Sequence, residues 1–245
     1  MTKKRLRVLS YNIHKGFNIG NRRFVLGNIR HALRATEADI LCLQEVVGEN
    51  QRRVKKHPQW ISESQLEFLA DTIWSHHAYG KNAVYPQGHH GNAILSKFAF
   101  SHYANHDISV LPFSQRGVLH AITENGIHVL CAHLGLLAWE RRHQMQKLQA
   151  ILQTIPLDAP LILAGDFNDW QEQAHALLLQ SGLREALQDV HGKPQKTFPS
   201  AWPMLRMDRI YYRHLQLQAA ACLHNHTWRL LSDHCPLYAE FSYPE

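Results

Sequence analysis

The chain has few cysteines, no long apolar run and no signal peptide. Its four cysteines form no CxxC pair and no metal-finger spacing, which argues against a zinc finger or a CxxC redox centre. Cys42 and Cys131 lie in apolar runs and are predicted to be core residues. No stretch of 18 apolar residues is present, so we expect a cytoplasmic protein without a transmembrane segment. The absence of an HExxH motif argues against a zincin-type hydrolase.

No Pro-, Gly- or Ser-rich linker divides the 245 residues, so we predict one domain over residues 1–245. The hydrophobic content of 45% is enough for one substantial core. The formal net charge of +6 favours polyanionic partners such as nucleic acid or anionic lipid. Many proteins carry such a charge without binding a polyanion, so the charge alone leaves this question open.

The predicted elements follow one another in a mixed order. Strands are predicted at residues 6–13, 39–43 and 160–165, and helices at 24–34, at 139–155 and behind a capping box of Ser62 and Gln65. Five short β-like runs lie between residues 77 and 133, and the chain from Met207 onward is typical of three strands. This order lacks the strict alternation of a barrel or a doubly wound sheet, and two sheets covered by helices fit it better.

Polar side chains gather at the ends of the predicted strands. They are Asn12, Glu45, Asn92, His133, Asp166, Asn168, Asp208, Asp233 and His234. One Asn or Asp after a strand is usually a turn residue. The set as a whole is harder to explain in that way, because loops on a rigid scaffold are where functional groups are placed.

Eight motifs occur in the order seen in one known group of enzymes. They are SYNIHKG (10–16), LQEV (43–46), GNAILS (91–96), QRGVLHA (115–121), CAHLG (131–135), GDFND (165–169), MDRIYY (207–212) and SDHCPL (232–237). On these motifs the chain resembles the endonuclease/exonuclease/phosphatase (DNase I-like) superfamily from residue 6 to 241. The resemblance implies a four-layer α/β sandwich, in which two mixed β-sheets pack face to face with helices on the outer sides. It places the active site at one end of the sandwich.

The resemblance also implies a Mg²⁺-dependent phosphoric ester hydrolase, with Mn²⁺ as the alternative metal. Glu45, Asn12 and Asp233 would hold the metal. The implied catalytic residues are Asp166, Asn168, Asp208, His133 and His234, and the implied phosphate-binding residues are Arg116, Asn92, His133 and Asn168. Asp208 would fix the tautomer of His234 and favour its charged form, while the choice between Asp166 and His234 as base stays open. Arg209, where many members carry His or Tyr, is expected to tune substrate contact.

Two substrate classes fit these residues. Nucleic acid is favoured by the basic loop Arg52-Arg53-Lys55-Lys56, by Lys15 beside the site, and by Trp60 and Trp202 as stacking platforms. A phospholipid or phosphoinositide hydrolase would place the same loop on an anionic membrane and insert Trp139, Trp202 and Phe198. We expect nucleic acid, because a lipid enzyme would more often show an export signal or a clear apolar loop. We also expect a monomer.

A catalytically inactive binding module is the third hypothesis, from a different functional class. Such a module should have lost at least one of the main site residues, which are Glu45, Asp166, Asn168, Asp208 and His234. All five are present, so the sequence favours the enzyme.

Overall fold

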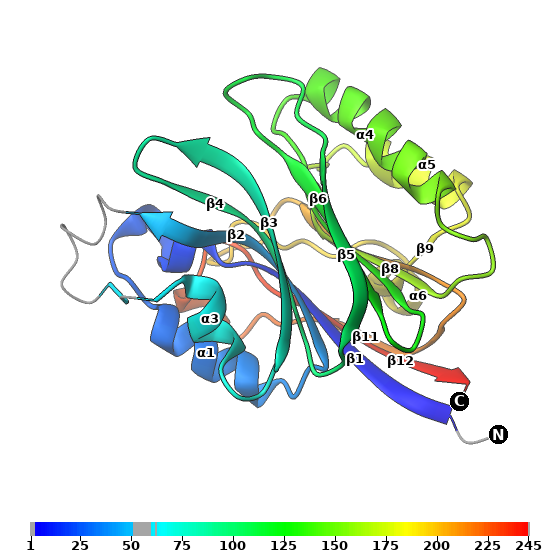
Figure 1. The fold of residues 1–245 in the computed structure, drawn as a ribbon, viewed down its shortest axis with the longest axis horizontal. Helices are drawn as coiled ribbons and strands as arrows, with labels where there is room; N and C mark the ends of the chain where they lie inside the picture. Colours follow the sequence, from blue (N-terminus) through cyan, green and yellow to red (C-terminus); the bar gives the residue numbers. More distant parts are fainter. Residues whose placement is uncertain (1–2, 51–59, 62, 245) are drawn as a thin grey trace.

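The structure is a computed structural model that describes residues 3–50, 60–61 and 63–244. Two six-stranded sheets pack face to face, and helices lie outside them (Figure 1). The first sheet contains β1 (Lys3–Asn12), β2 (Ile40–Asn50), β3 (His76–Tyr85), β4 (Gly88–Ser96), β11 (Gln216–Cys222) and β12 (Leu237–Pro244), in the order β11-β12-β1-β2-β4-β3. The second contains β5 (Phe100–Asp107), β6 (Gly117–Thr123), β7 (His128–His133), β8 (Leu161–Asp166), β9 (Arg184–Glu185) and β10 (Asp208–Arg213), in the order β5-β6-β7-β8-β10-β9.

Helices cover the outer face of each sheet. On the first sheet lie α1 (Leu26–Ala35) and α3 (Gln65–Ala70), and on the second lie α4 (Ala138–Gln153) and α5 (Gln173–Gln180) (Figure 1). A further helix, α6 (Ala186–His191), packs against β10 and β11 at the side of the sandwich. Short 3₁₀ turns occupy His14–Gly16, Ile19–Asn21 and Trp228–Leu230. None of the described helices is long and apolar enough to span a bilayer.

Three apolar clusters hold these layers together, and they confirm the predicted four-layer sandwich. The central cluster joins the facing sides of the two sheets, where Val8 and Ile94 of the first sheet and Leu119 and Ile162 of the second are fully buried. The other two clusters lie between each sheet and its helices. Because alternate residues of a strand point to opposite faces, each central strand contributes to the middle cluster and to an outer one.

Two local predictions differ from the structure. The strand β2 continues through Glu45 to Asn50, because a register shift between Leu43 and Val46 carries the chain around Glu45 without ending the ladder with β4. The capping box of α3 is formed by Ser64 and Glu67, while Ser62 lies outside the described residues. Gln65 instead begins the helix. The short elements β9 and α6 had no clear signal in the sequence.

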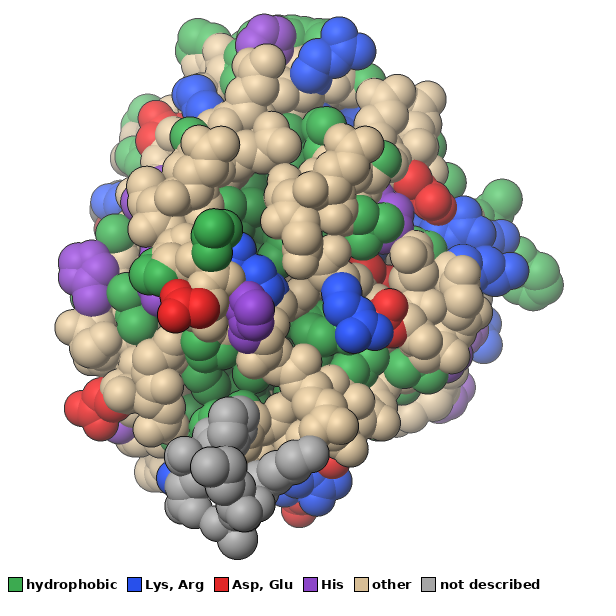
Figure 2. Space-filling view, turned by 90° about the vertical axis from the view of Figure 1, so that its right-hand side faces the viewer, with side chains coloured by type: hydrophobic (Ala, Val, Ile, Leu, Met, Phe, Trp, Pro, Cys, Tyr) green, Lys and Arg blue, Asp and Glu red, His purple; other side chains and the backbone are tan. Residues whose placement is uncertain are grey.

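Strand direction brings the predicted site residues to one end of the sandwich. In the first sheet β1 and β2 run parallel, with Asn12 beside Gln44. In the second sheet β7 runs parallel to β8 and antiparallel pairing joins β8 to β10, so that His133, Asp166 and Asp208 lie side by side. Figure 2 shows the opposite end, where the chain termini lie and where acidic, basic and His side chains are all present.

Gly165, just before Asp166, is required by the close approach of β7 to β8. Its φ is +151°, and an added Cβ would overlap the carbonyl oxygen of Ala132. We expect Gly165→Ala to lower the free energy of unfolding by about 2–4 kcal/mol, since both backbone strain and overlap have to be relieved. Urea denaturation measures the change. Gly27→Ala is the control: Gly27 lies in α1 with open space around a Cβ, so the same substitution should be neutral or stabilising by up to about 1 kcal/mol. Equal effects at both positions would contradict this account.

Candidate active site

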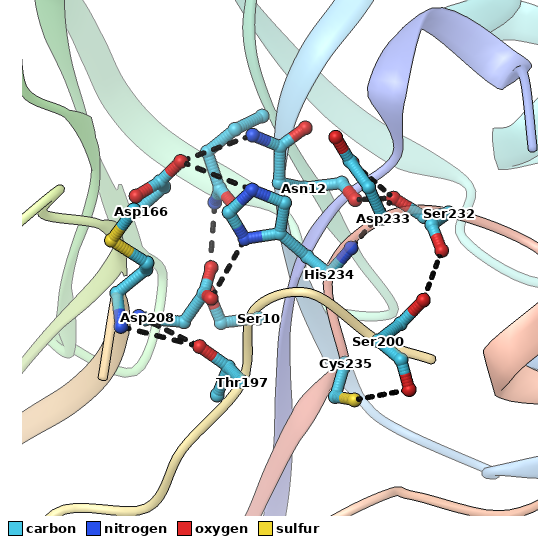
Figure 3. Close-up of polar contacts among 12 residues, drawn as sticks. Ser10, Asn12, Asp166, Thr197, Ser200, Asp208, Ser232, Asp233, His234 and Cys235 are labelled. Carbon is cyan, nitrogen blue, oxygen red and sulfur yellow. Dashed lines mark hydrogen bonds and ion pairs between the residues drawn. The ribbon is translucent and has the colours of Figure 1, made fainter. Parts of the chain in front are cut away.

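His234 lies between two buried carboxylates at the catalytic end of the second sheet. Its Nδ1 is 2.9 Å from Asp208 Oδ2, and its Nε2 is 3.7 Å from Asp166 Oδ2. Figure 3 shows the imidazole reaching from the loop before β12 into the space between the two strands that carry Asp166 and Asp208. On the other side of Asp166, His133 Nε2 lies 3.5 Å from Oδ2. The structure therefore brings together four of the residues that the sequence predicts to be catalytic, which are His133, Asp166, Asp208 and His234.

The carboxylate of Asp166 is also tied to the first sheet. Asn12 at the end of β1 donates from Nδ2 to Asp166 Oδ2 at 3.1 Å (Figure 3). The backbone N–H of Asn168 donates to Asp166 Oδ1, and Asn168 Nδ2 donates to the carbonyl oxygen of Leu134. Asn168 has a left-handed backbone with φ of 49°. Asn tolerates this conformation better than most residues, which explains an Asn at this turn.

Burial and charge shift the protonation of these groups in opposite directions. Burial and the nearby Asp208 raise the pKa of Asp166 to about 7, although His234 and hydrogen bonds from Asn168 and Asn12 oppose the rise. Burial lowers the pKa of His234, but Asp208, Asp166 and Asp233 outweigh it and raise the pKa to about 10. At neutral pH the site therefore holds a cationic His234 beside a carboxyl group that can exchange a proton.

His133 behaves differently from His234. Burial and the positive charge of Arg116 lower the pKa of His133 well below its ordinary value, although Glu45 opposes this. His133 is therefore neutral at pH 7 and can donate or accept a hydrogen bond across the site without adding charge.

Two acidic residues of the site each contact a side chain of one short segment. Lys15 Nζ lies 2.9 Å from Glu45 Oε2, and His14 Nδ1 lies 3.1 Å from Asp233 Oδ1. His14 and Lys15 both have positive φ, as does Glu45 at the bulge of β2. The amide of Gln65 holds this arrangement by donating to the carbonyl oxygen of Lys15 and accepting from the N–H of Val47.

The acidic pair of Glu45 and Asp233 fits a divalent cation. Burial raises the pKa of Glu45, but the charge and the hydrogen bond of Lys15 help bring it below its ordinary value, so the carboxylate is ionised. Burial also raises the pKa of Asp233, yet the hydrogen bond and charges of His14 and His234 bring it below its ordinary value. Two ionised oxygen ligands that require positive charge are what Mg²⁺ or Mn²⁺ prefers.

A second group of potential ligands consists of Asp166, Asp208 and His234, whose ligand atoms lie within 4.8 Å of one another; it is the only such group among the described residues. His234 Nδ1 is hydrogen-bonded to Asp208, and the charges of Asp208 and Asp166 raise the pKa of this imidazole to about 10. An imidazole has to be neutral to ligate a metal. The charge state therefore favours proton handling by this group, and the assignment of the metal to Glu45, Asn12 and Asp233 stays a prediction.

The structure assigns other tasks to two further residues that the sequence pointed to. The amide of Asn92 donates from Nδ2 to the carbonyl oxygens of Gly117 and Cys131, and so ties β4 to the second sheet under the site. Arg209 is 1% exposed, and its Nη1 donates to the carbonyl oxygens of Arg206 and Asp208. The prediction that Arg209 tunes substrate contact is wrong, because strand alternation turns its side chain away from Asp208 and into the protein.

Some residues that support the site gave no clear signal in the sequence. Ser232 Oγ donates to the carbonyl oxygen of Asn12 and accepts from the N–H of His234, which fixes the loop that carries the imidazole (Figure 3). Thr197 Oγ1 accepts from the N–H groups of Met207 and Asp208. The serine belongs to the SDH motif and could have been inferred from it. Thr197 could not, because only the folded chain brings its loop to β10.

The structure places the aromatic residues that the sequence pointed to, but it does not describe the predicted basic loop. Phe198 is half-buried, and its ring packs on His234 with 5.0 Å between ring centroids. Trp60 packs on Phe24 at 4.8 Å, whereas Trp202 is 76% exposed. Residues 52–56, which form the predicted basic loop, lie outside the described residues. Arg116 stands directly before β6, close enough to His133 for its charge to lower that pKa.

Comparison with known proteins gives matches over nearly the whole chain. The sequence profile described as "Endonuclease/Exonuclease/phosphatase family" matches residues 9–234. The protein YbhP of Escherichia coli (strain K12), described as uncharacterized, is 48% identical over 240 residues, which cover 96% of this chain and 95% of YbhP.

Solved structures of low sequence identity share the fold. A crystal structure of an endonuclease/exonuclease/phosphatase from Beutenbergia cavernae has a TM-score of 0.77 at 18% identity, covering 98% of this chain and 72% of that one. The structure of D. rerio TDP2 complexed with a single-strand DNA product has a TM-score of 0.65 at 17% identity, covering 97% and 98%.

The pKa of His234 tests the electrostatics of the site. We expect Asp208→Asn to lower this pKa from about 10 towards 6.5, because the first of the charges that raise it is removed. Since the folded pKa is the higher one, the interaction stabilises the fold below pH 6.5, and this stabilisation is lost as the pH rises through 10. NMR titration of the imidazole measures the pKa. Glu240→Gln, which removes a surface partner of Arg5, is the control and should leave it unchanged. An unchanged value in Asp208→Asn would refute the pairing.

Proposed function

The chain belongs to the endonuclease/exonuclease/phosphatase family, and from the geometry of its site we propose that it hydrolyses phosphodiester bonds with the help of a divalent metal ion. The observation that carries this proposal is the placement of His234 between Asp166 and Asp208. It gives one buried site both a cationic hydrogen-bond donor and a proton acceptor. We further propose that residues 1–245 act as one domain.

The groups divide the reaction between them. Asp166, with its pKa near 7, takes the proton of the attacking water as the new P–O bond forms. His234 donates a hydrogen bond to the phosphoryl oxygens, and Arg116 neutralises their charge. Asn168 orients the phosphate, and the bond to the leaving oxygen breaks. Glu45, Asn12 and Asp233 would hold Mg²⁺ or Mn²⁺, which supplies further charge neutralisation to the phosphoryl group and the leaving oxygen.

Nucleic acid is the substrate class that we propose first. Support comes from the net charge of +6, from Lys15 and Arg116 at the site, and from the fold shared with a TDP2 structure that holds a single-strand DNA product. A polyanion is attracted to such a site at long range. The exposed Trp202 and Trp170 offer faces on which unpaired bases can stack.

A phospholipid substrate at a membrane surface is the second candidate, favoured by an apolar rim. The rim consists of exposed side chains on the loops at the catalytic end of the second sheet: Phe113, Leu136, Leu137, Trp139, Trp170, Trp202 and Met204. The strand order β5-β6-β7-β8-β10 places these loops in one row. An ion pair of Arg206 with Glu172 and the stacking of Arg141 on Trp170 join neighbouring loops. Leucine and methionine lack the aromatic face on which unpaired bases stack, whereas they can enter a lipid interface.

Loss of the proton acceptor tests the proposed reaction. We expect Asp166→Asn to lower the rate about 10²–10⁴-fold with Mg²⁺ or Mn²⁺, because the attacking water loses its base. Hydrolysis of single- and double-stranded DNA, RNA, phosphatidylinositol phosphates, sphingomyelin and bis-p-nitrophenyl phosphate is measured with metal and with EDTA. Asp158→Asn, in an exposed turn before β8, should keep the wild-type rate. Wild-type turnover in Asp166→Asn would rule out this site. No turnover of any substrate by the wild type would favour an inactive binding module.

Membrane binding separates the two substrate classes. If lipid is the substrate, replacing Leu136 and Trp202 together by Ser should abolish co-sedimentation with phosphatidylglycerol vesicles in EDTA, where no turnover occurs. Leu157→Ser is the control, because Leu157 is 81% exposed but precedes β8 at the opposite end of the sheet. Weak vesicle binding by the wild type, or equal binding by all three proteins, would exclude the lipid candidate. Loss of DNA cleavage alone in the double variant would instead favour base stacking.

A further inference from the structure

Four histidines lie together on the outer face of the second sheet, away from the active site. His120 on β6 is paired with Ala104 of β5, and His102 and His106 lie two residues to either side of Ala104. His128 of β7 is diagonal to His120, whose own partner on that strand is Leu130. Because alternate residues share a face, all four side chains project from the side that α4 covers only in part.

In this histidine cluster (His102, His106, His120 and His128), the ring of His120 contacts those of His106 and His128. His120 Nε2 lies 2.9 Å from His128 Nδ1, and the two rings are stacked with centroids 5.1 Å apart. His106 stacks on the other side of His120 at 6.1 Å. The small side chain of Ala104 leaves room for His106 to reach over His120. Within the described part of the chain, the bond from His120 to His128 is the only side-chain hydrogen bond of the cluster.

The cluster is suited in charge state to bind a metal ion. Burial, followed by the charges of His128, His106 and His102, lowers the pKa of His120 to about 4. Burial and the charge of Arg213 lower the pKa of His128. These imidazoles are therefore neutral at pH 7, the form in which a ring nitrogen ligates a metal. Three or four imidazoles with no carboxylate among them match Zn²⁺, Ni²⁺ or Cu²⁺ rather than Mg²⁺ or Ca²⁺.

We propose that the imidazoles of His106, His120 and His128 bind one transition-metal ion of the Zn²⁺, Ni²⁺ or Cu²⁺ class, at a site separate from the catalytic centre. Two imidazole nitrogens bonded to one tetrahedral ion at about 2.0–2.1 Å lie roughly 3.3 Å apart, which needs only a small opening of the pair formed by His120 and His128. The proton of the hydrogen bond between His120 and His128 moves to the other ring nitrogen of the imidazole that donates it, so no proton is released. The ring nitrogens of His106, His120 and His128 do not all lie within 4.8 Å of one another in this structure, so His106 has to turn from its stacked position to complete the site. His102 on the same strand is the fourth ligand available.

The ion would join three strands at an edge of the sheet. The strand β5 is the outermost strand of the second sheet, and its pairing with β6 is its only strand pairing there. An ion held by His106 of β5, His120 of β6 and His128 of β7 links this edge to the interior. The other ends of β6 and β7 carry Arg116 and His133, so the ion stabilises the strands from which two site residues project.

Zinc binding to the full chain tests the proposal independently of any hydrolytic activity. The wild type and His120→Gln are titrated with Zn²⁺ by calorimetry at pH 7.5, and their melting temperatures are compared with and without the metal. We expect the wild type to bind one more equivalent than His120→Gln and to gain thermal stability that the variant does not gain. In the wild type, Cu²⁺ should show the EPR coupling of several imidazole nitrogens at this site, and that signal should be absent in His120→Gln.

Two further variants test whether zinc binding is specific to the cluster and whether the result depends on the stability of His120→Gln. His143→Gln removes an exposed histidine of α4 and should bind zinc like the wild type. His106→Gln removes a ligand from the edge strand; it should weaken zinc binding about tenfold or more even if His120→Gln proves too unstable to measure. Equal zinc stoichiometry and affinity in the wild type, His120→Gln and His106→Gln would overturn the proposal, whether or not the protein hydrolyses phosphodiesters.

Discussion

The site depends on a buried imidazolium held against carboxylates. His234 could not stay charged in the interior alone, because burial lowers its pKa. The buried carboxyl groups of Asp166 and Asp208 are likewise stabilised by a cation beside them. Asp208 binds Nδ1 closely, whereas Asp166 stays at 3.7 Å and keeps a pKa near 7.

That arrangement requires an accurate scaffold. The register that pairs Asp208 with Asp166, and Asp166 with His133, is fixed by strands whose other faces are buried in the core, where a shift by one residue would turn apolar side chains outward. Asn12 brings the first sheet to the same point through its bond to Asp166. The catalytic end is therefore a joint between two sheets, and Asn92 strengthens it from beneath.

Four of the nine described non-glycine residues with positive φ lie at the site. Among the described residues other than glycine, His14, Lys15, Glu45 and Asn168 all have positive φ. Such conformations cost free energy and persist only where surrounding contacts enforce them, as the amide of Gln65 does for Lys15. These backbone conformations turn the side chains of Glu45 and Lys15 towards the site, although the strand β2 continues past it.

The sequence by itself determined the fold class and singled out the residues that the fold brings together at one end of the sandwich. Alternating and continuous apolar runs marked the central strands, and short motifs such as GDFND and SDHCPL placed Asp166, Asn168 and His234 at their ends, because both signals are local in the chain. Tertiary structure alone decided the bulge at Glu45, the burial of Arg209, the support of Asp208 by Thr197 and the meeting of His106, His120 and His128. These features arise from strand register and from contacts between distant segments, and no local pattern of residues encodes which strands become neighbours.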